Sequence, residues 1–369
     1  MNSINGKINI LCSGVALGVY IPGISLYYQL TKTGCDAEVF VLENLLPDDI
    51  RDKISETKKI FHSNFKLAKI GQKIARDITP GLDQKKIDRL FSQWEGESDT
   101  LFILLSGFWL PLFERFGKRS LNESRVIIMH IDSVPSPSWK FLKEKHTGIR
   151  TCFLFSHDSQ RLNYRLNVST QSLVPFAQRE NRFLLHGGGW GMGTYRNAVD
   201  ILERRNHMLD IMAYSEDEIH PEKSKNRYFI VDPEWHPWLK NSRNEHIFPP
   251  VACVENRRGY QFISRPEYHE LFYVGARNKA IISKPGGSTL IDSLASATPL
   301  VFLDSFGPHE DFNASLWITL GLGISFTTWE QSDFSDNVLE TCHSNLLMAR
   351  VAPPDFIEVL TGDRKTGIA

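Results

Sequence analysis

Two glycine-rich segments, each between a strand-like run and a helix-like run, constrain this chain most. The first is HGGGWGMGTYRNAVDIL at 186–202, and the second is SKPGGSTLIDSLASATPLVFLD at 283–304. A glycine turn at such a junction lets the backbone approach an anion closely, and the N–H groups that open the helix point toward it. Two turns of this kind in one domain suit a diphosphate that carries a further group.

Apolar runs alternate with longer amphipathic stretches along the whole chain, which is typical of α/β proteins. The first strands are nearly continuous in Val, Ile, Leu and Phe, which favours a sheet covered by helices on both faces. Strands are predicted near 7–12, 38–42, 100–105, 125–130, 151–155, 183–186, 227–231, 246–248, 280–283 and 300–303, and helices near 22–33, 47–78, 84–95 and 138–146.

The chain length of 369 residues is long for one hydrophobic core and comfortable for two. The polar segment 175–182 precedes a fresh strand, so we place a domain junction there. We predict two Rossmann-like α/β domains, 1–178 and 179–369, with a ligand cleft between them. We allow the last helix to cross back to the first domain.

Composition excludes several classes of protein. The net charge of −1 gives no general attraction to nucleic acid or to an anionic membrane. Five widely spaced cysteines favour neither a zinc site nor a disulfide framework. The N-terminus does not have the pattern of a signal peptide, and no apolar run is long enough to span a bilayer. We therefore expect a cytoplasmic protein without a metal.

The glycine turns have rival interpretations. HGGG matches the oxyanion-hole segment of some lipases and esterases, but the G-x-S-x-G elbow that those enzymes need is absent. A dinucleotide fingerprint fails because Thr194 stands where the third glycine belongs, and no G-K-[ST] follows either turn. A tight turn that binds nothing remains the alternative, weakened by the presence of a second turn in the same position.

Three segments carry a resemblance to known enzymes. FLLHGGGWGMGTYRNAVDIL resembles the first strand, turn and helix of the second domain of plant monogalactosyldiacylglycerol synthases. ISKPGGSTLIDSLASATPLVFLD resembles the donor-binding turn and helix that those enzymes share with the bacterial lipid-II N-acetylglucosaminyltransferase, and PHEDFNASLWITLGLGISF (308–326) resembles the stretch that follows in both. The resemblance covers most of 183–326. It implies a GT-B glycosyltransferase whose C-terminal domain binds the nucleotide sugar and whose N-terminal domain binds the acceptor.

The resemblance also implies roles for individual residues. Backbone and hydroxyl donors of the second turn would bind the diphosphate, and the first turn would form the facing loop. A carboxylate would hold the ribose diol, a backbone group would contact the base, and an adjacent acidic and imidazole pair would contact the sugar hydroxyls. The corresponding residues are Gly286, Gly287, Ser288 and Thr289; Gly189, Gly191, Met192 and Gly193; Asp292; Ile263; and His309 with Glu310.

Two of these assignments have structural alternatives. Asp292 could be a solvated helix residue, although an ionised carboxylate is well suited to accept hydrogen bonds from two hydroxyls. His309 and Glu310 follow Pro308 and could instead cap a helix.

The general base is the point at which the chain departs from the resembling families. They carry a histidine shortly before a proline in the first loop, whereas this chain has CSGVALGVYIPG at 12–23, with Val19 in that position. Inverting transfer needs a base for the acceptor proton. Our first candidate is Asp132, which follows a strand, and the second is His130. His157 and Asp158, which also end a strand, are further candidates. For each residue, capping of the next segment is the alternative.

The segment 58–77 combines lysines with interleaved Ile and Phe residues. A basic amphipathic helix of this kind can rest on an anionic bilayer. An apolar stripe at this spacing is also typical of a helix that packs on the core. Peripheral contact with the inner face of the membrane is therefore an alternative to a purely soluble protein.

The leading hypothesis is an inverting glycosyltransferase that moves a sugar from a nucleoside diphosphate, with a UDP-sugar favoured, to a small acceptor. Backbone amides and helix N-termini can stabilise the leaving diphosphate, so no further cofactor is required. The alternatives are a lipid glycosyltransferase, a nucleotide-sugar epimerase or hydrolase, and a non-catalytic nucleotide-sugar-binding protein.

Overall fold

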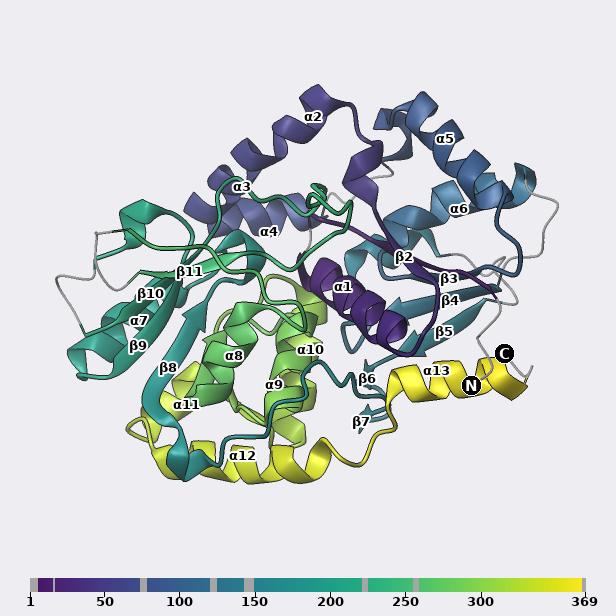
Figure 1. The fold of residues 1–369 in the computed structure, drawn as a ribbon. Coiled ribbons are helices and arrows are strands. Elements are labelled where there is room, and N and C mark those ends of the chain that lie inside the picture. The colour runs from purple at the N-terminus through teal and green to yellow at the C-terminus, as the bar shows by residue number, and fades with distance from the viewer. Residues whose placement is uncertain are drawn as a thin grey trace.

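A parallel five-stranded sheet organises the first half of the chain (Figure 1). The computed structural model describes residues 6–15, 17–73, 78–119, 125–142, 149–220, 225–254 and 259–366. The strand order is β2-β1-β3-β4-β5, which is that of flavodoxin-like sheets. The strands are β1 (Ile8–Cys12), β2 (Ala37–Val41), β3 (Leu101–Leu104), β4 (Arg125–His130) and β5 (Arg150–Phe153), followed by the short hairpin β6 (Phe155–Ser156) and β7 (Arg161–Leu162).

The helices of the first half differ from the predicted ones in two places. The predicted helix over 47–78 is broken, because Asn64 leaves the helical conformation and its side chain accepts a hydrogen bond from the N–H of Leu67. Within the predicted helix over 138–146, the described residues form a 3-10 turn at Pro137–Phe141, and 143–148 lies outside the described residues. The helices are α1 (Leu17–Lys32), α2 (Asp48–Asp52), α3 (Ile54–Ser63), α4 (Phe65–Lys73), α5 (Gln84–Glu95) and α6 (Leu110–Arg119).

The second half is built on a sheet with the order β11-β10-β9-β8-β12-β13-β14, in which β11 alone is antiparallel. Its six parallel strands have the Rossmann order. The sequence analysis missed β9, and it placed a strand at 246–248 that instead begins at Val251, after two prolines. The strands are β8 (Glu180–His186), β9 (Met208–Ala213), β10 (Arg227–Val231), β11 (Val251–Val254), β12 (Asn278–Ser283), β13 (Leu300–Phe302) and β14 (Gly323–Ser325).

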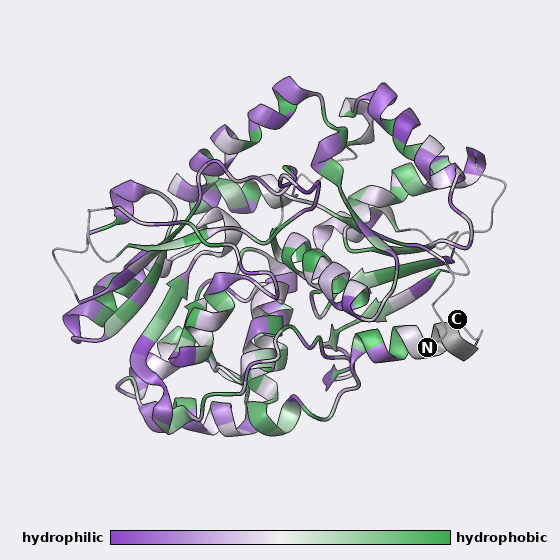
Figure 2. Ribbon diagram, in the orientation of Figure 1, coloured by the Kyte–Doolittle hydropathy of each residue, from purple (hydrophilic) through white to green (hydrophobic). Residues whose placement is uncertain are grey.

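Helices cover the second sheet, and the last one returns to the first half. Figure 2 shows hydrophobic residues concentrated in the strands and hydrophilic ones on outer helices such as α2 and α5. The final helix, α13, contacts α1 and lies beside the first sheet (Figure 1). The helices of this half are α7 (Tyr195–Arg204), α8 (Glu270–Arg277), α9 (Gly287–Ser296), α10 (Pro308–Thr319), α11 (Phe326–Gln331), α12 (Asp336–Ala349) and α13 (Phe356–Thr366).

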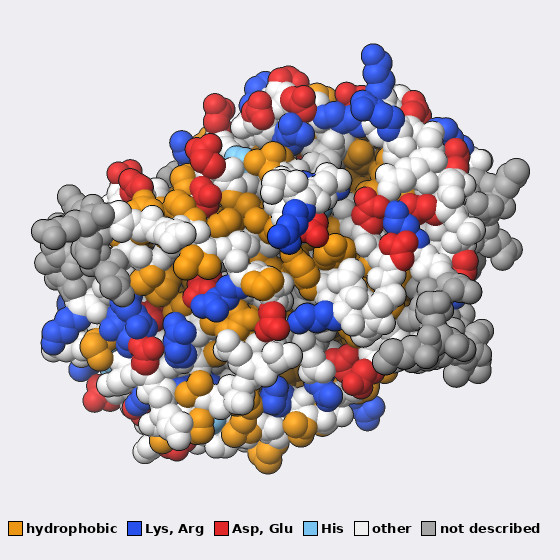
Figure 3. All heavy atoms as spheres, viewed as in Figure 1, with side chains coloured by type: hydrophobic (Ala, Val, Ile, Leu, Met, Phe, Trp, Pro, Cys, Tyr) orange, Lys and Arg blue, Asp and Glu red, His pale blue; other side chains and the backbone are white. Residues whose placement is uncertain are grey.

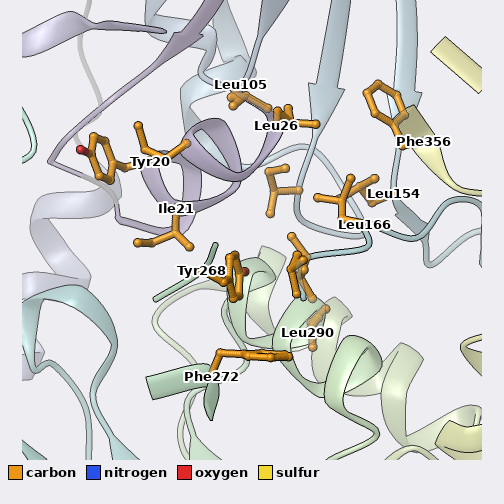
Figure 4. Close-up of a cluster of buried hydrophobic side chains, with 14 of the residues drawn as sticks. Tyr20, Ile21, Leu26, Leu105, Leu154, Leu166, Tyr268, Phe272, Leu290 and Phe356 are labelled. Carbon is orange, nitrogen blue, oxygen red and sulfur yellow. The ribbon is translucent and has the colours of Figure 1, made fainter. Parts of the chain in front are cut away.

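The two halves share one apolar cluster. Tyr20 and Ile21 of α1 belong to the same cluster as Tyr268 and Phe272 of the second half (Figure 4), and all four side chains are buried. The hydroxyl of Tyr20 also donates to the carbonyl of Ile247 at 2.9 Å. Figure 3 shows further hydrophobic side chains gathered across the middle of the molecular face. An apolar interface of this kind favours one fixed arrangement of the halves.

Candidate functional site

Both glycine turns lie at the topological switch point of the second sheet. β8 and β12 are neighbours, and His186 at the end of β8 is in register with Ser283 at the end of β12. From there β8 continues to β9 and β12 to β13, in opposite directions across the sheet. Open α/β sheets bind their ligands outside the carboxyl ends of the strands at such a point. The fold therefore brings together the two turns that are most suited to an anion.

The first turn requires glycine for steric reasons. A methyl group placed on Gly187 would lie 2.5 Å from the carbonyl carbon of Gly191 and 2.5 Å from the carbonyl oxygen of Met192. Gly191 itself has φ 58°, in the left-handed region. The N–H of Gly188 donates to Nδ1 of His186 at 3.2 Å, and burial lowers the pKa of His186 to about 4, so this ring is neutral at pH 7. The turn is therefore closely fixed on its strand.

The second turn presents a helix N-terminus and a lysine. Gly286 precedes α9, and the N–H groups of Gly287 and Ser288 have no carbonyl partner within the helix. Lys284 lies between the turns: methyl groups placed on Gly188 and Gly286 would be 3.6 and 3.5 Å from its Nζ. Thr289 is buried in the first turn of α9. A cation and two helix-end N–H groups thus face the same place, which favours a diphosphate ligand.

Glu310 pairs with this lysine and with the backbone just before α10. Its carboxylate pairs with Lys284 and accepts a hydrogen bond from the N–H of Phe306 at 2.6 Å, just before α10. The N-cap of α10 is Gly307 and has no side-chain cap hydrogen bond, so the bond from Phe306 to Glu310 is not a helix cap. Its neighbour His309 is half-buried. Contact of either side chain with a sugar remains a prediction.

Asn313, which the sequence analysis gave no role, joins the two halves at the turns. Its Nδ2 donates to Oδ1 of Asp132 at 2.8 Å and to the carbonyl of Pro285 at 2.9 Å. Its Oδ1 accepts a hydrogen bond from the N–H of Ser133 at 2.7 Å. Asn313 is fully buried. A fully hydrogen-bonded amide of this kind fixes the β4 loop against the second glycine turn.

Asp132 is the base candidate that contacts the second glycine turn. A methyl group placed on Gly287 would lie 2.9 Å from Oδ1 of Asp132 and 2.8 Å from the carbonyl oxygen of Ile131. The Asp132 side chain is half-buried. The first half therefore touches the second at this edge, with one carboxylate next to the N-terminus of α9.

The two histidine candidates differ in their surroundings. His130 is 1% exposed and stacks on Phe153 with ring centroids 4.1 Å apart, and burial lowers its pKa to about 4. These contacts favour a packing role. His157 is partly exposed, and its ring lies 4.7 Å from that of Phe312 on α10. Asp158 beside it is almost wholly exposed.

Asp292 lies in a buried polar cluster beneath the turns. Its Oδ1 is 3.1 Å from Nε2 of His269, and both residues are buried. The alternative of a solvated helix residue is therefore wrong. The Asp292 charge also acts on His186, where it opposes the effect of burial on the pKa. Sequence reasoning missed His186, which ends β8, and His269, which directly precedes α8, because a single histidine at the end of an element gives no distinctive signal.

Ile263 has an exposed side chain, but its backbone is engaged. Its N–H donates to the carbonyl of Val251 at 3.1 Å, and its carbonyl accepts from the N–H of Val251 at 3.0 Å. The carbonyl retains a second lone pair, whereas the N–H has no further hydrogen to donate. Any backbone contact between Ile263 and a base would therefore use the carbonyl oxygen.

The first loop of the first half has a carboxylate of its own. Buried Glu43 accepts hydrogen bonds from the hydroxyl of Ser13 at 2.6 Å and from the N–H groups of Gly14 and Val15 at 2.6 and 3.1 Å. Val19 lies in α1 and packs against the shared core. Val19 therefore supplies no base, and the N–H groups of Gly14 and Val15 are already bonded to Glu43.

The segment α3–α4 comes from the first half but packs on the first glycine turn (Figure 1). Nδ1 of His62 is 2.7 Å from the carbonyl oxygen of Gly191, and the ring of Phe61 lies 5.7 Å from that of Trp190. Lys58 lies over Trp190, and burial lowers its pKa. Met192 is buried in the same cluster. Part of the predicted amphipathic segment thus forms an interface, while 74–77 lies outside the described residues.

The described ranges contain neither a cluster of metal ligands nor a membrane-spanning helix. Within them, no three His, Cys, Asp or Glu side chains are grouped as metal ligands would be. None of the helices in the same ranges combines the length and the apolar content that a membrane span requires.

No protein-family model matches the chain, and no curated protein matches it in sequence. Its fold is similar to solved structures of three glycosyltransferases. MurG of Acinetobacter baumannii is 11% identical over 98% of this chain and 99% of MurG, with a TM-score of 0.51. VinC in complex with dTDP is 10% identical over 98% of both chains, and the spinosyn rhamnosyltransferase SpnG is 10% identical over 98% of this chain and 100% of SpnG, each with a TM-score of 0.54. At these identities the likeness shows the fold alone. The predicted fold class is confirmed: this chain has the GT-B fold of nucleotide-sugar glycosyltransferases.

Proposed function

We propose that this protein is a glycosyltransferase that takes a sugar from a nucleoside diphosphate. The observation that carries the proposal is the pair of glycine turns at the switch point of the second sheet, with Lys284 between them. A diphosphate there would meet the N–H groups of Gly287 and Ser288 and the lysine cation. Solved structures with the same fold are glycosyltransferases, and one of them was determined with dTDP.

In the proposed reaction Asp132 accepts the proton of the acceptor hydroxyl while the diphosphate leaves. Asn313 positions Asp132 through a 2.8 Å hydrogen bond. The helix N-terminus and Lys284 stabilise the negative charge that develops on the leaving group. No metal is required by this scheme. The base and sugar of the donor are left open, with a UDP-sugar as our first choice.

A second candidate is a protein that binds a nucleotide sugar without transferring it. It is favoured by the first loop, where Val19 replaces the base of the resembling families and Glu43 occupies the backbone donors. Both candidates require the donor site, so a binding measurement comes first and a turnover measurement separates them.

The donor site is tested by thermal shift with UDP, GDP, CDP, ADP, dTDP and their sugar conjugates. A ligand at a hundred times its dissociation constant adds about 2.7 kcal/mol of stability. We expect one nucleotide family to stabilise the protein. Gly187→Ala should lower its affinity at least about tenfold, because the added methyl would lie 2.5 Å from backbone atoms of the turn.

The matched control is Gly18→Ala in α1, where no heavy atom lies within 4 Å of the added methyl. This variant should be slightly more stable, by about 0.4–1 kcal/mol, and should keep the nucleotide response. If no nucleotide stabilises the wild type, the glycine turns are structural and the proposal fails.

We further propose that the acceptor is reached at a membrane surface through α3–α4. Three apolar side chains are exposed there: Ile60 at 51%, Leu67 at 41% and Ile70 at 57%. Lys59 and Lys66 are exposed beside them. Insertion of such side chains into a bilayer is favourable by about 1.5–3 kcal/mol each, and lysines add attraction to anionic lipid. A small soluble acceptor is the alternative.

Co-sedimentation with phosphatidylglycerol vesicles tests this membrane contact. We expect the wild type to bind and the double variant Ile60→Ser, Ile70→Ser to bind at least about tenfold more weakly. Ile318→Ser on α10 is the control, since Ile318 is also exposed, at 44%, but lies outside the segment. Wild-type protein that stays in the supernatant at low salt would leave the soluble acceptor as the answer.

A further inference from the structure

A cavity of about 170 Å³ lies outside the site described above. It is enclosed by the linker 166–174 between the two halves, by α8, by the end of α9 and by Arg350. Its volume is below the 300–1,000 Å³ that is typical of pockets for drug-sized ligands. A small metabolite is therefore the size of molecule that it accommodates.

The lining of this cavity combines apolar walls with cationic groups. Leu166, Phe272 and Ala295 supply apolar surface, and Arg277 and Arg350 are its charged residues. The lining contains no Asp or Glu, and all of it falls within the described ranges. The cavity therefore combines positive charge with apolar surface.

Arg350 is the unusual member of this set. Its Nε is buried without a hydrogen-bond partner, and no described carboxylate pairs with its guanidinium. Burial and the neighbouring charge of Arg165 lower the pKa of Arg350. Leaving a buried donor unsatisfied costs about 1–3 kcal/mol. Arg277 differs, because its Nε lies 3.5 Å from Glu180.

Arg179, a buried arginine beside the cavity, adds to the positive charge. Arg179 donates to the carbonyls of Val174 at 3.1 Å and Ser296 at 2.9 Å, and both of these residues line the cavity. No described carboxylate is among the hydrogen-bond acceptors of its guanidinium. Its donors are used by carbonyl oxygens and by the hydroxyl of Thr298, so it contributes charge beside the cavity but no donor to a ligand.

We propose that this cavity binds a small monocarboxylate with an apolar body, the carboxylate against Arg350 and the body against Leu166 and Phe272. A guanidinium recognises a planar carboxylate through two parallel hydrogen bonds. The guanidinium of Arg350, which has no carboxylate partner among the described residues, matches one negative charge, and the apolar surface disfavours inorganic anions. This site is separate from the proposed nucleotide-sugar site and does not depend on it.

The cavity lies where the chain crosses between the halves. The linker runs beside α9 and α12 in space, and the chain crosses back to the first half between α12 and α13 (Figure 1). The two crossings are bonded to each other: Nη1 of Arg165 donates to the carbonyl of Pro353 at 2.7 Å, and the N–H of Phe356 donates to the carbonyl of Arg165 at 3.0 Å. A ligand held by Arg350 and the linker therefore contacts both crossings and should reduce their local opening.

Calorimetric titration with benzoate and butyrate, at constant ionic strength, tests the proposal. Benzamide, which has the shape of benzoate without its charge, and inorganic phosphate are the ligand controls. We expect benzoate to bind and benzamide and phosphate not to bind. Arg350→Gln should lower benzoate affinity at least about tenfold, whereas Arg277→Gln, at the same cavity but paired with Glu180, should change it less than about threefold.

Hydrogen exchange supplies a second measurement on the unaltered protein. Benzoate should slow exchange of the amides in 166–174 and leave those of α5, in the first half, unchanged. The proposal is overturned if benzoate does not bind the wild type, if benzamide binds equally well, or if Arg350→Gln binds benzoate as the wild type does. If Arg350→Gln does not fold, Arg350→Ala and the exchange experiment answer the same question.

Discussion

Asp132→Asn should lower turnover by a factor of about 10²–10⁴ while donor binding stays intact. The carboxylate is the base candidate at the N-terminus of α9, and the carboxamide that replaces it cannot accept a proton at neutral pH. The carbonyl oxygen of the new side chain can still accept the hydrogen bond from Asn313, so the β4 loop should keep its place. Steady-state kinetics and a nucleotide titration on the same preparation measure both quantities.

Asp158→Asn is the matched control for this prediction. Asp158 has the same chemistry, but it lies between β6 and β7 and its side chain is 94% exposed. Its replacement should leave turnover within about a factor of two. If Asp132→Asn retains wild-type turnover, the base lies elsewhere, and His157→Gln is the next variant to measure. Loss of donor binding together with turnover would instead assign Asp132 to the donor site.

Asp210→Ala should destabilise the protein by about 3–5 kcal/mol, the largest stability effect that we expect from a single side chain. Asp210 is fully buried in β9. Its carboxylate accepts from Nε of Arg182 at 2.7 Å, from Nε and Nη2 of Arg227 at 2.7 and 2.5 Å, and from Nδ2 of Asn278 at 2.9 Å. Removal of the carboxylate leaves the buried guanidinium of Arg182 without its counter-ion, whereas Arg227 keeps Glu180 as a partner at 2.7 Å. Urea unfolding measures the loss.

Asp333→Ala provides the comparison for Asp210. Asp333 also pairs with an arginine, Arg205, at 3.4 Å, but its side chain is 83% exposed. Solvent-exposed pairs of this kind contribute about 0–1 kcal/mol. Equal destabilisation by the two variants would mean that the Asp210 network is compensated by water or by rearrangement, contrary to our expectation. Because Asp210 lies near the amino ends of the strands, neither variant should change nucleotide affinity directly.

The fold was predictable where sequence patterns are local. The apolar run of β4 and the two glycine turns are recognisable without tertiary information, and the turns led to the GT-B fold class. β9 was missed because Asp210 interrupts the apolar pattern of MLDIMA, and only the arginines of neighbouring strands explain a carboxylate in that position. A buried ion pair is a long-range feature that a single strand does not reveal.

The candidate site was predictable in part for the same reason. The residues within each turn are adjacent in sequence, so a common role for them could be proposed from the sequence. Asn313 and Glu43 act across the fold, on the β4 loop and on the first loop respectively, and nothing in their local sequence indicates those partners. Lys284 belongs to the second glycine-rich segment, but only the fold places its ammonium group between the two turns.

The shared cluster around Tyr20 and Tyr268 bears on whether this protein can be treated as two exchangeable modules. A chimera that joins its first half to the second half of another GT-B protein would face Tyr20 and Ile21 with a foreign surface, and apolar side chains without a complementary partner promote aggregation. Such a graft would have to carry Tyr268, Phe272 and Leu290 along with the glycine turns. An exchange of the second half that is meant to change the nucleotide sugar would therefore also have to preserve the apolar contacts between the two halves.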